Sequence, residues 1–476
     1  MVQVSLTLIG FFKLFLRLFE RLQTRVKTLI GSAERLQDGL HFLRFQFPRH
    51  GCSVVVTCCD VSTCTRMTCV APGNARLILC LKEKKKKKMA APPSPQETVV
   101  ITGGGGYFGH RLGCTLHRAG VNVVLFDVRK PSQDVPNGIQ FIQGDIRSPS
   151  AVEEAFTNAS CIIHTASYGM SGREQLQTRL SEEVNVKGTE NVIQACIKKS
   201  IPRLVYTSTF NVVFGGQSIK NGDESMPYLP LNRHADNYSR TKAIAEEKVL
   251  KSNGQPLANN SGHLRTCALR SAGIYGPGEQ RHLPRIINTL DQGLFLFSYG
   301  DRNNLVQFIH VDNLVSAHIL ASKALTDEKN HVAAGQAYFI ADAAPIDNFQ
   351  FFRPFIEGLG YKFPSARLPL FLIYVLSYLT EWLHFLIRPI CNFQPLLTRA
   401  EVYKTGITHY FSIEKAKKEL GYEPESYTMQ EVVEWYKARG YGKKVRKMKR
   451  ASYLWDVAIF VLLVMAVLAW GPRVVG

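Results

Sequence analysis

Short, almost continuously apolar runs alternate with segments of helical periodicity from Thr98 onward. The runs are rich in β-branched residues, and their apolar character indicates strands covered on both faces of a parallel sheet. The predicted strands are Thr98–Thr102, Asn122–Asp127, Ile139–Ile142, Cys161–His164, Arg203–Ser208 and Thr266–Arg270. The clearest predicted helices between them are Phe108–Ala119, Gln175–Lys199 and Asn237–Lys251. This alternation predicts an α/β fold built on a doubly wound parallel sheet.

The pattern changes after Arg270, where helical and strand-like segments follow one another in mixed order. The segments predicted there are a helix over Val311–Leu325, a strand over Ala337–Ala341 and an amphipathic helix over Met429–Ala438. The sequence therefore predicts a first domain over residues 96–270 and a smaller, mixed α/β C-terminal lobe over residues 271–442. We expect this lobe to hold the substrate.

A different kind of apolar segment lies near the C-terminus. Residues 454–470 are uncharged except for Asp456, are flanked by Trp455 and Trp470, and follow six Lys and Arg residues between positions 443 and 450. These features are typical of a single membrane span with a cytoplasmic basic flank. We therefore expect residues 443–476 to form a juxtamembrane segment and a transmembrane helix. The rest of the chain should lie on the cytoplasmic side, at the endoplasmic reticulum.

Residues 368–386 form another apolar segment, but this one carries Glu381 and His384, and Pro389 follows it. Charged or polar groups are costly within a bilayer, so they argue against a simple span. Two interpretations stay open: an element that dips into the membrane or forms a substrate entrance, and an ordinary buried helix.

Residues 1–88 follow neither pattern. They hold +11 of the net charge of +20 and six of the eleven cysteines, without the paired spacing of a zinc site, and we predict no metal centre. Met89 begins a plausible natural start shortly before the first strand. We expect either an unstructured gene-model addition or a targeting arm. The largest basic run outside this region precedes the C-terminal apolar segment, which favours an anionic lipid surface over nucleic acid as a partner.

A glycine-rich turn follows the first predicted strand and leads directly into a helix. The stretch Thr102–Gly109 places Gly103, Gly106 and Gly109 at Gly-x-x-Gly-x-x-Gly spacing, with Tyr107 and Phe108 at the start of the helix. Glycines permit a tight turn and close backbone approach, and a helix N-terminus offers free N–H groups and a partial positive charge. The sequence therefore predicts a cradle for the pyrophosphate of a dinucleotide.

Asp127 ends the second predicted strand, at the place where a carboxylate can bind the adenosine ribose hydroxyls and repel a 2′-phosphate. This predicts NAD as the cofactor. Arg129 and Lys130 follow closely and weaken the preference, so NADP remains an alternative.

Tyr238 and Lys242 lie four residues apart, on one face of the predicted helix Asn237–Lys251. A tyrosine is a poor base at neutral pH because its ordinary pKa is about 10. A neighbouring ammonium group favours the phenolate and lowers that pKa. The pair therefore predicts acid–base chemistry on a substrate oxygen.

Several short motifs occur in an order and spacing that resemble the extended short-chain dehydrogenase/reductase family, whose fold is a Rossmann fold. They are Thr102–Gly109, Asp127, Gly144–Ile146, His164–Ala166, Asn185–Thr189, Val205–Thr209 and Tyr238–Lys242. Two further motifs, Ile274–Gly278 and Phe308–Asn313, extend the resemblance to the 3β-hydroxysteroid dehydrogenase branch and, within it, to family 42E. The resemblance covers residues 98–470 and includes the C-terminal span.

The resemblance implies catalytic roles for three residues. Tyr238 would accept the substrate proton, Lys242 would assist it and bind the nicotinamide ribose, and Thr209 would hold the substrate oxygen. Many relatives carry serine at the position of Thr209, and Ser208 is the neighbouring alternative. Either hydroxyl can donate a hydrogen bond to a developing alkoxide.

The resemblance also implies cofactor contacts beyond the glycine turn. Asp145 and Ile146 would lie beside the adenine, and Asn185 would support the helix that carries Tyr238, or merely cap that helix.

The function predicted from these features is NAD-dependent interconversion of a secondary alcohol and a ketone on a sterol-like lipid, by a membrane-bound protein that could form homodimers. The resemblance implies that an additional isomerase activity would need a second Tyr-x-x-x-Lys pair. Tyr238 alone among the 18 tyrosines has Lys at the fourth position after it, and Tyr299 has Asn303 there, so we do not expect isomerase activity. Two alternatives stay open: a nucleotide-sugar epimerase or dehydratase, and a non-catalytic protein that senses the cofactor.

Overall fold

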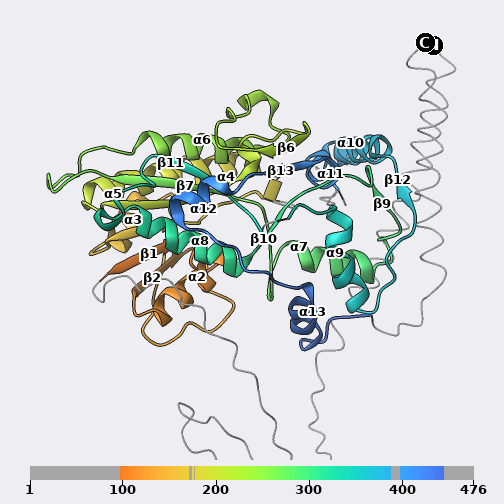
Figure 1. Ribbon diagram of the computed structural model, residues 1–476, viewed down its shortest axis with the longest axis horizontal. Coiled ribbons are helices and arrows are strands. Elements are labelled where there is room, and N and C mark those ends of the chain that lie inside the picture. The colour runs from red at the N-terminus through yellow and green to blue at the C-terminus, as the bar shows by residue number, and fades with distance from the viewer. Residues whose placement is uncertain (1–96, 171–173, 176, 343, 388–396, 444–476) are drawn as a thin grey trace, which may run out of the picture. The chain divides into compact units, whose positions relative to one another are not determined.

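The computed structural model describes residues 97–170, 174–175, 177–342, 344–387 and 397–443. Its centre is a seven-stranded parallel sheet in the order β11-β7-β5-β4-β1-β2-β3 (Figure 1). The strands are β1 (Thr98–Thr102), β2 (Asn122–Asp127), β3 (Gln140–Gln143), β4 (Cys161–His164), β5 (Arg203–Thr209), β7 (Arg265–Ser271) and β11 (Gln336–Ile340). The chain crosses over next to β1, so the predicted doubly wound fold is confirmed.

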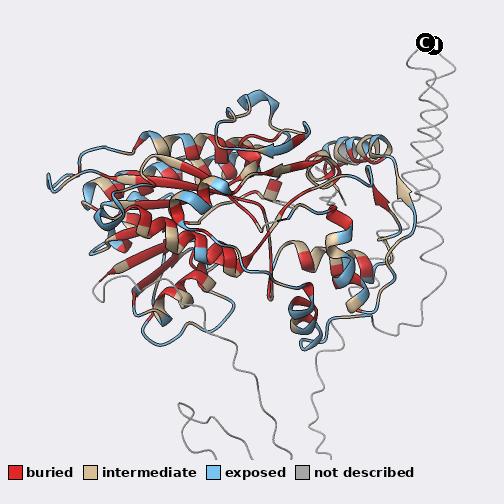
Figure 2. Ribbon diagram, in the orientation of Figure 1, coloured by how far each residue is buried: buried red, intermediate tan, exposed pale blue. Residues whose placement is uncertain are grey.

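Helices cover both faces of this sheet, because the strand side chains alternate between two apolar layers. Val99 and Ile101 of β1 belong to one layer, and Val100 belongs to the other. The first layer packs against α2 (Tyr107–Arg118), α8 (Val311–Ala324) and α12 (Glu414–Leu420). The second layer packs against α3 (Pro149–Ala155), α5 (Thr189–Lys198) and α6 (Asn237–Lys251). Figure 2 shows the resulting continuous buried interior.

The remaining elements gather apart from the sheet and are held by smaller apolar clusters (Figure 1). They include α7 (His282–Asp291), α9 (Asn348–Gly358), α10 (Leu370–Ile387), α11 (Arg399–Gly406) and α13 (Met429–Lys437). Three two-stranded parallel pairs connect distant parts of the chain. The pairs are β8 (Gly273–Tyr275) with β10 (Phe308–His310), β9 (Ser298–Tyr299) with β12 (Arg367–Leu368), and β6 (Ile219–Gly222) with β13 (His409–Phe411).

The structure corrects two expectations drawn from the sequence. The strand expected in the C-terminal lobe, residues 337–341, is β11 and pairs with β7 at the edge of the main sheet. The expected helix over residues 175–199 consists of α4 (Thr178–Glu182), a π-helical turn η3 (Glu183–Gly188) and α5. Apolar periodicity identifies a strand or a helix, but it does not say which sheet the strand joins or where a π-helical turn interrupts an α-helix.

Within the part of the chain that the structure describes, no helix is both long and apolar enough to cross a membrane. The predicted span over residues 454–470 and the extension over residues 1–88 lie outside the described residues.

Candidate active site and cofactor cradle

The glycine turn lies between the end of β1 and the start of α2, and backbone contacts leave no room for side chains there. A Cβ on Gly103, whose φ is +74°, would lie 2.7 Å from the Ala166 amide nitrogen. A Cβ on Gly109 would lie 2.3 Å from the Gly103 carbonyl oxygen. The Gly106 amide donates to that same carbonyl, over 3.0 Å, which closes the turn. Glycine is therefore required at positions 103 and 109 by the path of the backbone.

The turn presents the N-terminus of α2. Gly106 precedes the helix, no side chain caps it, and its first turn carries no acidic residue. The side chains of Tyr107 and Phe108 serve the fold, since the Tyr107 hydroxyl donates to the Pro277 carbonyl and the Phe108 ring packs in the core. Their amide groups belong to the first helical turn, where N–H groups lack partners within the helix. This arrangement fits an anionic ligand such as a pyrophosphate.

Asp127 lies at the end of β2, directly beside the turn. Its carboxylate oxygens accept hydrogen bonds from the amides of Gly105 and Arg129, at 3.0 and 3.1 Å. Burial raises the pKa of Asp127, and these amide hydrogen bonds oppose the rise. Each carboxylate oxygen keeps a lone pair that can accept from a ribose hydroxyl. The position and chemistry of Asp127 therefore fit its predicted role.

Asp145 and Ile146, which are predicted to contact the adenine, lie just after β3. Arg147 donates to the Asp145 carboxylate over 2.7 Å. Burial raises the pKa of Asp145, but the hydrogen bonds from Arg147 outweigh this and lower the pKa overall. The Ile146 side chain is buried against Gly188, and its carbonyl accepts from Asn191 over 2.9 Å.

Helix α6 carries the predicted catalytic pair. Asp236 caps the helix by accepting from the Ser239 amide over 2.7 Å. Tyr238 and Lys242 are both buried, one turn apart. The Lys242 ammonium group donates to the Thr207 carbonyl of β5 and lies 4.0 Å from the centre of the Tyr206 ring. The pair predicted from the sequence is therefore brought to the carboxyl end of β5.

The pKa values of this pair are set mainly by burial. Burial lowers the pKa of Lys242 to about 7, against the opposing charge of Glu246. Burial raises the pKa of Tyr238 to about 12, and the Arg281 guanidinium partly offsets this rise. Arg281 comes from the loop before α7 and pairs with Glu174 at 3.5 Å. The spacing of Tyr238 and Lys242 gave no indication of Arg281, because it is distant in the chain.

Thr209 ends β5 and is almost fully buried. Its hydroxyl oxygen accepts from the Asn211 side-chain amide over 2.9 Å, which leaves the hydroxyl proton available for another acceptor. The Ser208 hydroxyl instead donates to the buried Glu246 carboxylate. Of the two candidates, Thr209 is therefore the one whose hydroxyl is free to bind a substrate oxygen.

Asn185 connects the catalytic helix to a neighbouring loop. Its side chain donates to the Thr241 hydroxyl of α6 over 2.9 Å and to the Tyr168 carbonyl over 2.8 Å. It also accepts from the Tyr168 amide over 2.8 Å. Asn185 lies in the π-helical turn η3, and such turns are frequent at functional sites. It supports α6, as the sequence predicted.

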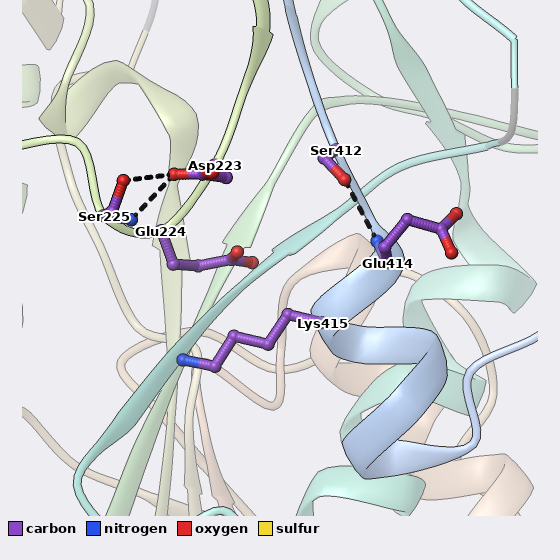
Figure 3. A pocket seen from close by; sticks show the side chains of 6 residues that line it. All are labelled: Asp223, Glu224, Ser225, Ser412, Glu414 and Lys415. Carbon is purple, nitrogen blue, oxygen red and sulfur yellow. Dashed lines mark hydrogen bonds between the residues drawn. The ribbon is translucent and has the colours of Figure 1, made fainter.

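A surface hollow lies elsewhere, between the loop after β6 and the start of α12 (Figure 3). Its lining contains the carboxylates of Asp223, Glu224 and Glu414 and the ammonium group of Lys415. None of the predicted site residues lines it. An excess of carboxylates does not suit the phosphates of a dinucleotide.

Comparison with known proteins gives matches over most of the chain. A sequence model of the 3-beta hydroxysteroid dehydrogenase/isomerase family matches residues 100–370. Short-chain dehydrogenase/reductase family 42E member 1 of Xenopus laevis is 64% identical over 366 residues, which cover 77% of this chain and 95% of that relative. The Homo sapiens protein of the same name is 61% identical over 77% of this chain and 94% of its own length. The 3beta-hydroxysteroid-dehydrogenase/decarboxylase isoform 1 of Arabidopsis thaliana is 39% identical over 60% of this chain and 63% of its own length.

Solved structures share the fold at low sequence identity. The crystal structure of gox2253 is 20% identical and has a TM-score of 0.56, over 73% of this chain and 100% of that chain. DesIV, a dTDP-glucose 4,6-dehydratase from Streptomyces venezuelae with NAD and TYD bound, is 21% identical and has a TM-score of 0.55, over 72% of this chain and 98% of that chain. At these identities the likeness concerns the fold alone.

Proposed function

The chain belongs to the 3-beta hydroxysteroid dehydrogenase/isomerase family, and we propose that it interconverts a secondary alcohol and a ketone on a sterol-like lipid, with NAD as the cofactor. One observation carries the proposal: Tyr238 and Lys242 are buried together on α6, at the end of the strand that carries Thr209. The three groups supply a proton acceptor, a cation and a hydroxyl donor, which are the groups that alcohol oxidation needs.

The cofactor contacts follow from the cradle. NAD, when bound, supplies the hydride acceptor for oxidation, and NADH supplies the hydride for reduction. The first turn of α2 would hold the pyrophosphate, Asp127 the adenosine ribose, and Lys242 the nicotinamide ribose. The negative charge of Asp127 would repel a 2′-phosphate, which supports NAD over NADP.

The proton is handled by the residues of the chain. In the oxidative direction, the Tyr238 phenolate oxygen takes the proton of the substrate hydroxyl, and in the reductive direction it returns that proton. Thr209 donates a hydrogen bond to the substrate oxygen as charge develops on it. Because burial raises the pKa of Tyr238 to about 12, the phenolate requires nearby positive charge. Arg281 supplies part of it, and we assign the rest to Lys242, one turn away on the same face of α6.

The surface of α10 supports the proposal that the substrate is apolar. Phe371, Tyr378, Trp382 and Phe385 recur at seven-, four- and three-residue intervals, so they share one face of the helix. They are 76%, 48%, 55% and 73% exposed, and Tyr441 is the only other aromatic residue among the described ones that is exposed. Exposed Trp and Tyr rings among other apolar side chains are typical of a membrane interface. We propose that this face lies against lipid, at the place where the substrate enters.

Ion pairs link α10 to the catalytic helix. Glu381 of α10 binds Arg399 of α11 at 2.7 Å. Lys404 of α11 binds Asp236, the residue that caps α6, at 2.6 Å. Two ion pairs made by α11 therefore connect the proposed lipid-facing helix α10 to α6, the helix that carries Tyr238.

A turnover screen tests the substrate class. The full chain, purified in detergent with NAD, is offered a lipid extract, 3β-hydroxysterols and nucleotide sugars in separate reactions, and NADH fluorescence is followed. We expect NADH to form with the sterols and with the lipid extract. Tyr238→Phe serves as the control for background reduction. Conversion of a nucleotide sugar with no net NADH formation, together with no NADH from the sterols or the lipid extract, would replace the proposal with an epimerase or dehydratase function, because those reactions return the hydride to the sugar.

A further inference from the structure

A buried carboxylate lies one turn beyond Lys242 on the catalytic helix. Tyr238, Lys242 and Glu246 are each four residues apart, so all three share one face of α6. Glu246 has no solvent exposure. An ionised carboxylate in such a place is very costly unless it is paired and hydrogen-bonded.

The contacts of Glu246 meet that requirement. Arg270 of β7, itself buried, donates to one carboxylate oxygen at 2.7 and 2.9 Å. The Tyr228 hydroxyl donates to the same oxygen over 2.8 Å, and the Ser208 hydroxyl donates to the other. The guanidinium carbon of Arg270 lies 5.3 Å from the centre of the Tyr228 ring and 5.2 Å from the centre of the Phe339 ring. A fully paired buried carboxylate of this kind can remain charged.

This cluster lies directly behind the catalytic groups. Ser208 precedes Thr209 in β5, and Arg270 pairs in register with Ser208 across the sheet. The groups around Lys242 are the Tyr206 ring and the Thr207 carbonyl of β5, His164 of β4, and Glu246 on its own helix. Burial lowers the pKa of His164 to about 3, so this imidazole is neutral near pH 7. Glu246 therefore supplies the negative charge that acts on Lys242.

We propose that Glu246 is a positioning residue for hydride transfer: its charge favours the protonated form of Lys242, and its hydrogen bond to Ser208 fixes the strand end that presents Thr209. Arg270 is the counter-ion that allows the carboxylate to stay ionised. The inference rests on the proposed function, because it assigns a working role to the Lys242 cation. Burial of Lys242 disfavours its charged form, so removal of the Glu246 charge lowers the pKa of Lys242 further.

Glu246→Gln tests the electrostatic part in the full chain. Glutamine keeps the shape of the side chain and removes its charge, so Lys242 should lose its proton at a lower pH. We expect the high-pH loss of NADH binding, and of turnover where turnover is present, to move down by about one pH unit or more. Tyr228→Phe is the matched control, because it removes one hydrogen bond to Glu246 and no charge. Its pH profile should stay where that of the parent protein lies.

Glu246→Gln also leaves Arg270 as an unpaired buried cation, which should destabilise the protein. The double variant Glu246→Gln/Arg270→Met removes that cation and should recover thermal stability while its pH profile remains shifted. Because NADH binding needs no substrate, absence of sterol turnover in the parent protein would count against the proposed function and leave this test intact. An unshifted binding profile in both variants would overturn the role of Glu246. So would a profile that returns to its original position when the double variant recovers stability.

Discussion

At the scale of single residues, the site depends on side chains whose charged form is disfavoured by burial. The ammonium group of Lys242 is buried beside the Tyr206 ring, and one backbone carbonyl accepts a hydrogen bond from it. Burial therefore lowers the pKa of Lys242 to about 7. The sequence identified Lys242 and Tyr238 because their spacing on a helix is local. It did not identify Arg281 or Arg270, because only the folded chain brings these side chains to α6.

The low pKa of Lys242 predicts a pH dependence of stability. Its ordinary pKa is 10.5, so between about pH 7 and pH 10.5 the unfolded chain binds a proton that the folded chain has lost. The contribution of this group to the free energy of unfolding therefore rises with pH across that interval. Lys242→Met should abolish the rise. Thermal unfolding of the detergent-extracted full chain, without added NAD, measures both proteins; parallel pH profiles would contradict the assignment.

Asp127 predicts the choice of cofactor. Asp127→Ser removes the charge that repels a 2′-phosphate and leaves Arg129 in place. We expect the affinity ratio of NADH to NADPH to fall by about tenfold, which corresponds to ~1.4 kcal/mol. Equilibrium fluorescence titration with both nucleotides measures the ratio. Tighter binding of NADPH by the unmodified protein would refute the role given to Asp127.

At the scale of elements, the sequence predicted the strands better than their partners. Strands covered on both faces give continuous apolar runs, and for that reason β1, β2, β4, β5 and β7 were found with nearly their observed bounds. The pairing of β6 with β13 joins segments almost two hundred residues apart, which no local pattern encodes. The π-helical turn η3, which carries Asn185, was not predicted either, because the contacts of Asn185 with Tyr168 and Thr241 form only in the folded chain.

Helix α10 corresponds to the apolar segment over residues 368–386, and its exposed aromatic face favours the membrane-facing interpretation over the buried one. Bromine-labelled lipids quench tryptophan fluorescence only at short range. In vesicles that contain these lipids, the fluorescence assigned to Trp382, obtained as the difference between the parent protein and Trp382→Phe, should be strongly quenched. Leu231→Ser, which changes an exposed apolar residue far along the chain on η5 (Leu231–Arg233), should leave the quenching unchanged.

Unquenched Trp382 in vesicle-bound protein would show that α10 faces water or another part of the protein. Attachment of the protein to the vesicles does not decide this point, because it can come from other segments of the chain. The readout is therefore specific to the surface of α10.

At the scale of the whole molecule, the sheet, the glycine turn and the catalytic helix form one connected unit, to which the chain after α6 contributes β7, β11, α8 and α12. The other elements after α6 gather apart from the sheet. Motif spacing predicted the first part, because a nucleotide-binding turn and a Tyr-x-x-x-Lys helix are local features with fixed chemistry. The substrate region was predicted only as a mixed lobe. Its residues come from loops and short helices whose positions depend on tertiary packing.

The central claim is that Tyr238 transfers the substrate proton, and single-turnover hydride transfer in Tyr238→Phe tests it most directly. Phenylalanine preserves the buried ring and removes the hydroxyl, so folding and equilibrium NADH binding should be retained. The rate should fall by about 10²- to 10⁴-fold or more. Thr209→Ala, measured beside it, should also lower the rate while cofactor affinity stays nearly the same. Undiminished hydride transfer in Tyr238→Phe, with normal NADH binding, would contradict the account.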